Sequence, residues 1–225
     1  MERVETFEFN GYTATVVQPE NPNGKWIWKT EFFTAFDQAE RDLLERGYTR
    51  VYYQISDKYG SYKAVRLMHN FYLHVTKKYG LSDKAILFGF SRGGLYAFNF
   101  TLAYPEYVEK VYLDAPVLDV RTWPWAGSKE QAELFAEYDL NAETLAHFKG
   151  MPIENLAEYF ALNIPTLIIA GVADEVVPFD KNSGKLLAFA KENGYTVQNI
   201  LKPEGLHHPH SLDDTTPIID FVEGK

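Results

Sequence analysis

One serine of this sequence lies in a setting that favours nucleophilic chemistry. Ser91 is the centre of Gly89-Phe90-Ser91-Arg92-Gly93, between the apolar run 85–88 and a helix-like stretch from Leu95 to Tyr104. A strand, a glycine-flanked serine and a helix are the parts of a nucleophile elbow. Such a turn leaves no room for side chains two residues away from the serine, and the helix N-terminus favours the negative charge that forms when a serine attacks a carbonyl. The segment therefore predicts acyl-transfer chemistry with Ser91 as the nucleophile.

An acid and a base follow in the order that this chemistry uses. The run 165–171 predicts a buried strand with Asp174 in the loop after it, and a shorter strand over 197–202 is followed by a turn that carries His207. Loops at the carboxyl ends of parallel strands converge on one rim of a sheet. A neutral imidazole can take the serine proton, and an aspartate can accept the other ring N–H. We therefore predict that Ser91, Asp174 and His207 form a catalytic triad.

Alternatives exist for both partners of the serine. Asp114 follows the predicted strand 108–113 and is a rival acid, whereas His208 and His210 are rival bases. The three histidines, together with Asp213 and Asp214, also have the side-chain types that bind divalent metals. Because a triad already accounts for this loop and the sequence has no other obvious ligand cluster, we expect neither a metal nor another cofactor.

The elements that must position these residues alternate along the chain. Strands are predicted over residues 4–9, 12–18, 25–28, 49–55, 85–88, 108–113, 165–171 and 197–202. Helices are predicted over 32–46 and 62–79, and after Ser91 as far as Tyr104. Strands that alternate with helices imply an α/β fold in which a mostly parallel sheet of about eight strands is covered on both faces.

The stretch 119–163 interrupts this alternation. It holds helix candidates at Ser128 to Tyr138 and Asn141 to Phe148, and we predict that it forms a short helical cap above the catalytic rim, within a single domain spanning 1–225. Trp123 and Trp125 at its start, and Tyr59 after the fourth strand, are predicted to line the mouth and bind substrate. The same rings could instead pack the cap onto the sheet.

These motifs carry a family resemblance. Over nearly its whole length, through the segments 89–94, 171–178 and 205–207, the chain resembles the α/β-hydrolase superfamily, and within it small bacterial esterase-like hydrolases, some of them described as prolyl-oligopeptidase relatives. The resemblance implies a three-layer α/β-hydrolase fold and a Ser-Asp-His triad used most often on carboxylic esters.

The resemblance also implies an oxyanion hole of two backbone N–H groups. The residue after the nucleophile, Arg92, supplies one of them. The third strand lacks the His-Gly motif that marks the second donor and continues instead as Lys29-Thr30-Glu31-Phe32-Phe33. We predict Lys29 as that donor.

Composition and charge exclude several kinds of site and partner. The chain has 225 residues and no cysteine, which excludes disulfides, thiolate metal sites and cysteine nucleophiles. A formal charge of −9 opposes nucleic acid or an anionic membrane as a partner. With no leader-like start and no window long and apolar enough to span a bilayer, we expect a soluble, cytoplasmic protein.

Three function classes remain open, because a fold alone does not choose among them. The first is a serine esterase that cleaves a small-molecule ester, with a short acyl chain, through an acyl-enzyme intermediate. The second is a serine peptidase or amidase that acts on short peptides. The third is a catalytically silent binding protein that has kept the fold. The sequence carries no signal for the oligomeric state.

Overall fold

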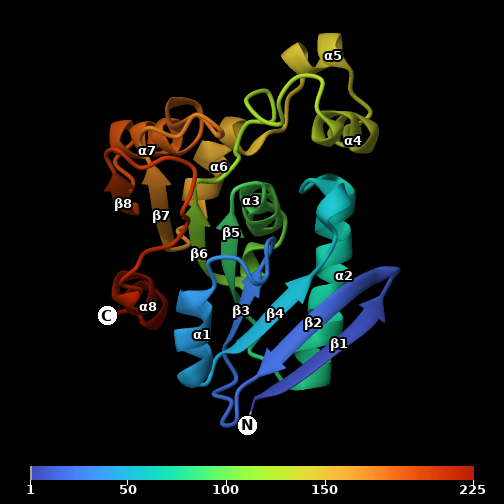
Figure 1. Cartoon of the computed structure of the whole chain (residues 1–225), viewed down its shortest axis with the longest axis vertical. Helices are drawn as coiled ribbons and strands as arrows, with labels where there is room; N and C mark the ends of the chain where they lie inside the picture. The colour runs from blue at the N-terminus through green and yellow to red at the C-terminus, as the bar shows by residue number, and fades with distance from the viewer. Residues whose placement is uncertain (1) are drawn as a thin grey trace.

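A computed structural model describes residues 2–225, which fold around one eight-stranded sheet of order β1-β2-β4-β3-β5-β6-β7-β8 (Figure 1). The strands are β1 (Arg3–Phe9), β2 (Tyr12–Gln18), β3 (Trp26–Lys29), β4 (Thr49–Tyr53), β5 (Ala85–Phe90), β6 (Val108–Asp114), β7 (Thr166–Gly171) and β8 (Gln198–Lys202). The strands from β3 to β8 run parallel, whereas β2 pairs antiparallel with both β1 and β4. The predicted mostly parallel sheet is therefore confirmed.

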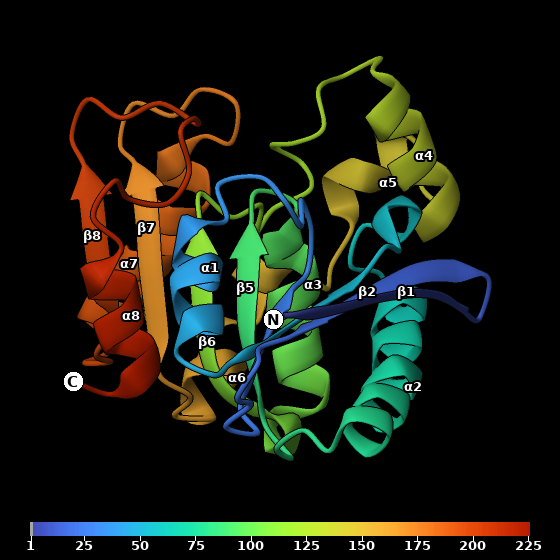
Figure 2. The ribbon, with the colours of Figure 1, turned by 60° about the horizontal axis from the view of Figure 1, so that its bottom comes forward.

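Helices cover both faces of this sheet, which confirms the predicted three layers (Figure 2). One face packs against α1 (Gln38–Glu45) and α8 (Thr216–Glu223), and the other against α2 (Tyr62–Tyr79), α3 (Gly93–Ala103), α6 (Leu156–Ala161) and α7 (Ser183–Glu192). Helices α6 and α8 are additions to the elements predicted from the sequence. Neither helix has a side-chain cap hydrogen bond at its N-terminus, although Pro217 in the first turn of α8 is a helix-start signal.

The helix predicted for residues 32–46 begins only at Gln38. Phe32 and Phe36 have φ values of +56° and +50°, a left-handed conformation that a right-handed helix does not contain. Arg50 holds this segment, because its guanidinium donates to the carbonyl of Phe33 at 3.2 Å and to Asp37 at 2.8 Å. Residues 30–37 therefore form an ordered loop, the β3–α1 loop, at the carboxyl end of the sheet.

The predicted cap helices exist, but they lie to one side of the catalytic rim. Figure 1 shows α4 (Lys129–Tyr138) and α5 (Ala142–His147) above the end of α2 rather than above β5. The carboxylates of α4 anchor it there: Glu137 accepts a hydrogen bond from Ser61 at 2.6 Å, and Glu133 accepts one from Tyr59 at 2.7 Å. These contacts with the segment after β4 explain why the cap sits beside the site.

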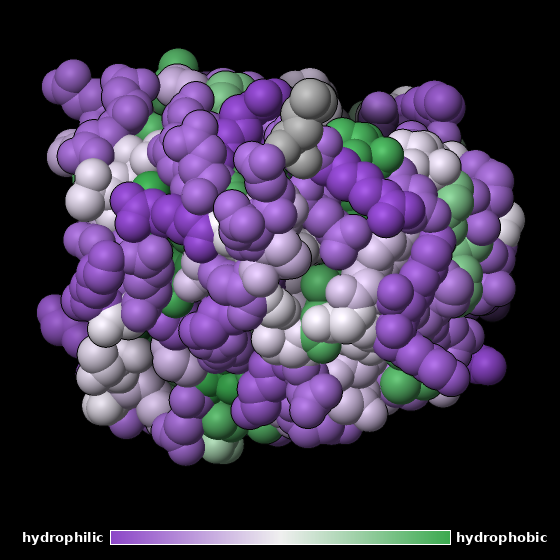
Figure 3. All heavy atoms as spheres, turned by 90° about the horizontal axis from the view of Figure 1, so that it is seen from below, coloured by the Kyte–Doolittle hydropathy of each residue, from purple (hydrophilic) through white to green (hydrophobic). Residues whose placement is uncertain are grey.

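The remaining elements are single 3-10 turns, and the face seen from below is mainly polar (Figure 3). The turns are η1 (Ser56–Lys58), η2 (Pro105–Tyr107), η3 (Pro152–Glu154) and η4 (Phe179–Lys181). Seen from below, hydrophobic side chains appear only as scattered spots among hydrophilic ones (Figure 3). Among residues 2–225, no helix is both long enough and apolar enough to cross a membrane.

Candidate active site

Ser91 occupies a tight turn between β5 and α3. Its φ of +49° is unusual for a residue with a side chain, and such strain is typical of a nucleophile elbow. The turn is fixed by the backbone: the Ser91 N–H donates to the carbonyl of Asp114 at 2.9 Å, and the Ser91 carbonyl accepts the N–H of Val117 at 2.8 Å. The strand, turn and helix predicted around Ser91 are therefore present.

The two glycines of the elbow are required by close packing. A Cβ at Gly89 would lie 2.9 Å from Cβ of Ala97, and one at Gly93 would lie 2.8 Å from Oγ1 of Thr30. Real Cβ atoms essentially never approach other atoms that closely, so any larger residue would shift the turn. The predicted reason for glycine at positions 89 and 93 is confirmed.

The structure brings Ser91, His207 and Asp174 into one hydrogen-bonded line. Oγ of Ser91 lies 3.0 Å from Nε2 of His207, and Nδ1 of His207 lies 2.7 Å from Oδ2 of Asp174. All three residues are buried, each with at most 6% of its surface exposed. This arrangement favours the tautomer in which Nδ1–H points at Asp174 and Nε2 is free to accept the serine proton.

The loop geometry that orients Asp174 is local. The second carboxylate oxygen of Asp174 accepts the backbone N–H groups of Val176 and Val177, each at 2.9 Å. The N–H of Ala173 donates to the carbonyl of Gly205 at 3.0 Å, which ties the aspartate loop to the histidine loop. Both carboxylate oxygens are thus satisfied, and the carboxylate is held facing the imidazole.

The rival acid and bases have other partners. Asp114 lies 2.7 Å from Nδ1 of His210 through Oδ1, and its Oδ2 accepts the hydroxyl of Tyr112 and the N–H of Ser211. His208 is exposed and stacks on Phe36, with ring centroids 5.7 Å apart. The sequence marked Asp114 as a candidate acid because it follows a predicted strand. Its pairing with His210 was not predicted.

The elbow supplies one free backbone donor for an oxyanion, and the β3–α1 loop supplies another. Within residues 2–225 the N–H of Arg92 donates to no protein group, and it lies at the N-terminal end of α3. Lys29, the predicted second donor, pairs with Tyr52 and Phe88 inside the sheet. Because the ladder continues through the N–H of Thr30, Lys29 is the wrong residue for this role. Phe32 replaces it as the candidate, since its N–H has no acceptor among the described residues and it lines the pocket beside Ser91.

A partly buried ion pair lies beside these two backbone N–H groups. The guanidinium of Arg92 lies 3.0 Å from a carboxylate oxygen of Glu31 and 5.2 Å from the ring centroid of Phe32. Burial raises the pKa of Glu31, and the charge of Arg92 acts against that rise. The hydroxyl of Thr30 also donates to the carbonyl of Gly93 at 2.8 Å. The β3–α1 loop and the elbow are therefore fixed relative to each other by side chains whose pairing the sequence analysis did not predict.

The pocket at Ser91 is small and largely aromatic. Its volume is about 280 Å³, and Phe32, Phe36 and Trp123 line it together with His207, His208 and His210. Trp123 thus lies where the sequence predicted. Trp125 does not, because it is 62% exposed and outside the lining, and Tyr59 is fully buried with its ring 6.3 Å from that of Trp123. Tyr59 therefore packs behind the pocket, where its hydroxyl is already bonded to Glu133.

A larger cavity lies away from this chemistry. Its volume is about 460 Å³, and it is enclosed by Tyr62 of α2, Asn99 of α3 and Tyr138 of the cap. Ser91, His207 and Asp174 are not among the residues that line it. This cavity is therefore separate from the pocket at Ser91.

Comparisons with known proteins identify the family and the fold. Residues 45–223 match the model of the prolyl oligopeptidase family. A comparison with curated proteins gives no match.

Solved structures share the fold at low sequence identity. The S-formylglutathione hydrolase FrmB of Staphylococcus aureus has a TM-score of 0.68 at 14% identity, covering 100% of this chain and 96% of that one. FphF, a fluorophosphonate-binding serine hydrolase of the same organism, has a TM-score of 0.70 at 16% identity, covering 92% and 91%. The acylaminoacyl peptidase of Pyrococcus horikoshii has a TM-score of 0.66 at 14% identity, and the match covers 92% of this chain but 38% of that one. The predicted α/β-hydrolase fold is confirmed.

Proposed function

Because the chain belongs to the prolyl oligopeptidase family and is an α/β-fold serine hydrolase, we propose that it cleaves carboxylic esters with short acyl chains. The observation that carries the proposal is the line from Ser91 through His207 to Asp174, with hydrogen-bond distances of 3.0 Å and 2.7 Å, at the wall of a pocket of about 280 Å³.

In the first half of the proposed reaction, Nε2 of His207 takes the hydroxyl proton as Oγ of Ser91 forms a bond to the ester carbonyl carbon. The carbonyl oxygen becomes an oxyanion that accepts the N–H groups of Arg92 and Phe32; losing one such donor costs about 3 kcal/mol of barrier lowering in other acyl-transfer enzymes. Asp174 stabilises the imidazolium that forms. The carbon–oxygen bond to the leaving alcohol then breaks, and His207 returns its proton to that alcohol.

In the second half, water replaces the alcohol. His207 takes a proton from the water as the water oxygen attacks the carbonyl carbon of the acyl-enzyme. The bond to Oγ of Ser91 then breaks, His207 returns the proton to Oγ, and the carboxylic acid leaves. Both halves use the same oxyanion donors.

The pocket supports a short acyl chain. Phe32, Phe36 and Trp123 enclose a volume of about 280 Å³, which is at the lower end of ligand sites. Their rings offer flat apolar surfaces to an acetyl group and to the alcohol beside it. The preference for esters over peptides is further supported by coverage, since the chain aligns with 96% and 91% of the two hydrolases but with 38% of the peptidase.

Amide hydrolysis is the second candidate function, because the family model carries the name of an oligopeptidase and an acylaminoacyl peptidase is among the structural neighbours. The same triad geometry serves both reactions, so the substrate must be tested directly.

A substrate panel separates the two candidates. We expect p-nitrophenyl acetate and butyrate to be hydrolysed with a far higher kcat/KM than aminoacyl p-nitroanilides, with ester hydrolysis falling steeply beyond roughly four acyl carbons because the pocket limits chain length. The Ser91→Ala variant gives the background rate for each substrate. Faster cleavage of the anilides would overturn the ester proposal, and a preference for octanoate would overturn the short-chain part.

A further inference from the structure

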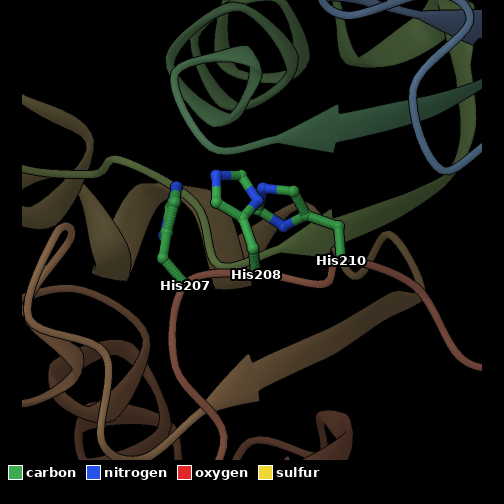
Figure 4. Close-up of side chains that lie close together, drawn as sticks. All are labelled: His207, His208 and His210. Atoms are coloured by element: carbon green, nitrogen blue, oxygen red, sulfur yellow. The ribbon is translucent and has the colours of Figure 1, made fainter.

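We propose that the histidine loop after β8 is a zinc-binding site, formed by His207, His208 and His210, and that zinc bound there switches hydrolysis off. Figure 4 shows the three imidazoles side by side along this loop. One ring nitrogen of each lies within 4.8 Å of those of the other two. All three residues line the pocket that holds Ser91, so an ion can reach them from solvent.

The spacing is close to that of a zinc site. Tetrahedral zinc with bonds of about 2.0–2.1 Å to nitrogen places its ligand atoms about 3.4 Å apart. Ring nitrogens that now lie up to 4.8 Å apart must therefore approach one another by up to about 1.4 Å. His208 is the ring with the most freedom to move, because it is exposed and contacts its neighbours through its ring, including stacking on Phe36. Three imidazoles without an oxygen ligand select zinc and similar transition metals over magnesium or calcium.

Two of the three imidazoles already have the carboxylate support that metal-binding histidines use. Asp174 holds Nδ1 of His207, and Asp114 holds Nδ1 of His210, each at 2.7 Å. Such partners fix the tautomer that leaves Nε2 for a metal. Asp114 is buried and takes no part in the proposed hydrolysis, and its oxygens are also held by Tyr112 and Ser211. A histidine loop that serves only a catalytic triad needs one carboxylate–imidazole pair. This loop has a second pair, Asp114 and His210, which is oriented in the same way and has no role in the triad.

Zinc at this site acts on hydrolysis through His207. A metal bound to Nε2 occupies the lone pair that accepts the proton of Ser91, whose Oγ lies 3.0 Å away. The loss of activity therefore rests on the proposed function, whereas zinc binding itself does not.

Binding is tested with the full chain by calorimetric titration with zinc chloride and by the visible absorption of added cobalt(II), which reports tetrahedral nitrogen ligation. We expect one high-affinity site in the wild type and in Ser91→Ala, and at least tenfold weaker binding in His208→Ala and in His210→Ala. His147→Ala, which removes an exposed imidazole on α5, is the matched control and should bind like the wild type. The absence of a site, binding as tight as wild type in His208→Ala or His210→Ala, or loss of binding in His147→Ala would overturn the proposal.

The supporting carboxylate and the effect on activity are tested separately. Asp114→Asn keeps the shape of the side chain and should weaken zinc binding by roughly 10- to 100-fold, as loss of a carboxylate behind a metal-binding histidine does elsewhere. Zinc should abolish ester hydrolysis by the wild type, EDTA should restore it, and magnesium should have no effect. If Ser91→Ala binds zinc while the zinc-saturated wild type stays fully active, the site exists but the switch does not.

Discussion

At the scale of single residues, two buried carboxylates, Asp114 and Asp174, lie at the ends of neighbouring strands. They differ in the histidine to which each is hydrogen-bonded. Asp174 faces His207, which is hydrogen-bonded to Ser91, whereas Asp114 faces His210, which has no hydrogen bond with Ser91 within residues 2–225. In the proposed mechanism, the orientation of the imidazole that takes the serine proton therefore depends on Asp174.

This difference gives a testable ranking of the two aspartates. Asp174→Asn should lower kcat for p-nitrophenyl acetate by about 10⁴-fold, because the histidine then adopts the wrong tautomer, as in other triads. Asp114→Asn should lower kcat far less. Steady-state kinetics with metal-free protein measure both values, and the reverse ranking would transfer the acid role to Asp114.

The two tryptophans of the cap segment provide a second test. Trp123 lines the pocket, whereas Trp125 is 62% exposed and lies outside it. Trp123→Ala should widen the pocket and raise kcat/KM for hexanoate or octanoate relative to acetate, since pocket volume limits the acyl chain. Trp125→Ala is the matched control and should leave the chain-length profile unchanged. An altered profile in Trp125→Ala alone would show that the cap approaches the substrate differently.

The sequence predicted those site residues that depend on local pattern and chain order. Ser91 is recognisable from its glycines and from the strand and helix around it, and Asp174 and His207 from their order after strands. Tyr59 and Lys29 were placed wrongly because their environments are set by distant segments. The carboxylate that bonds to Tyr59 comes from α4, and the ladder that contains Lys29 depends on β4 and β5.

At the scale of elements, the β3–α1 loop positions both Phe32, the proposed oxyanion donor, and two aromatic rings that line the pocket, those of Phe32 and Phe36. A buried ion pair between Lys29 of β3 and Glu40 of α1 stabilises the loop. Nζ of Lys29 lies 2.6 Å from Oε1 of Glu40, and each side chain is 1% exposed. The ammonium of Lys29 also donates to the carbonyl of Ala35 within the loop. The pair thus links a strand end, a helix start and the loop between them.

Breaking this pair should destabilise the protein. Lys29→Met leaves the carboxylate of Glu40 buried without a partner, which typically costs about 3–5 kcal/mol in the free energy of unfolding. The double variant Lys29→Met/Glu40→Met removes both charges and should recover most of the loss. Urea unfolding followed by circular dichroism measures the two values. Equal destabilisation in the single and double variants would mean that packing rather than charge pairing holds the loop.

In the same loop, hydrophobic periodicity predicted a helix that does not form. Phe32, Phe33 and Phe36 have the spacing of an amphipathic helix, which is why a helix was predicted from residue 32. The positive φ values at Phe32 and Phe36 are stabilised instead by Arg50, which lies on β4 and bonds to Phe33 and Asp37. A long-range contact therefore overrides a local pattern at the segment that forms the site.

At the scale of the whole molecule, the sheet order brings β5, β6, β7 and β8 side by side, so that the segments after them meet at one rim. Alternation of strands and helices was sufficient to predict this architecture and its three layers. The lateral position of α4 and α5 could not be predicted, because it follows from the bonds of Glu133 and Glu137 to a segment some 75 residues earlier in the chain. Because α4 and α5 lie to one side, the β3–α1 loop and the histidine loop contribute most of the residues that line the pocket.

The central claim is that Ser91 is the nucleophile, and covalent labelling tests it most directly. Metal-free protein is treated with a fluorophosphonate probe, digested and mapped by mass spectrometry, with Ser91→Ala as the control. We predict one modified residue, Ser91, loss of esterase activity in proportion to labelling, and no labelling of Ser91→Ala. Labelling at another residue, or full activity in a protein labelled at Ser91, would contradict the account.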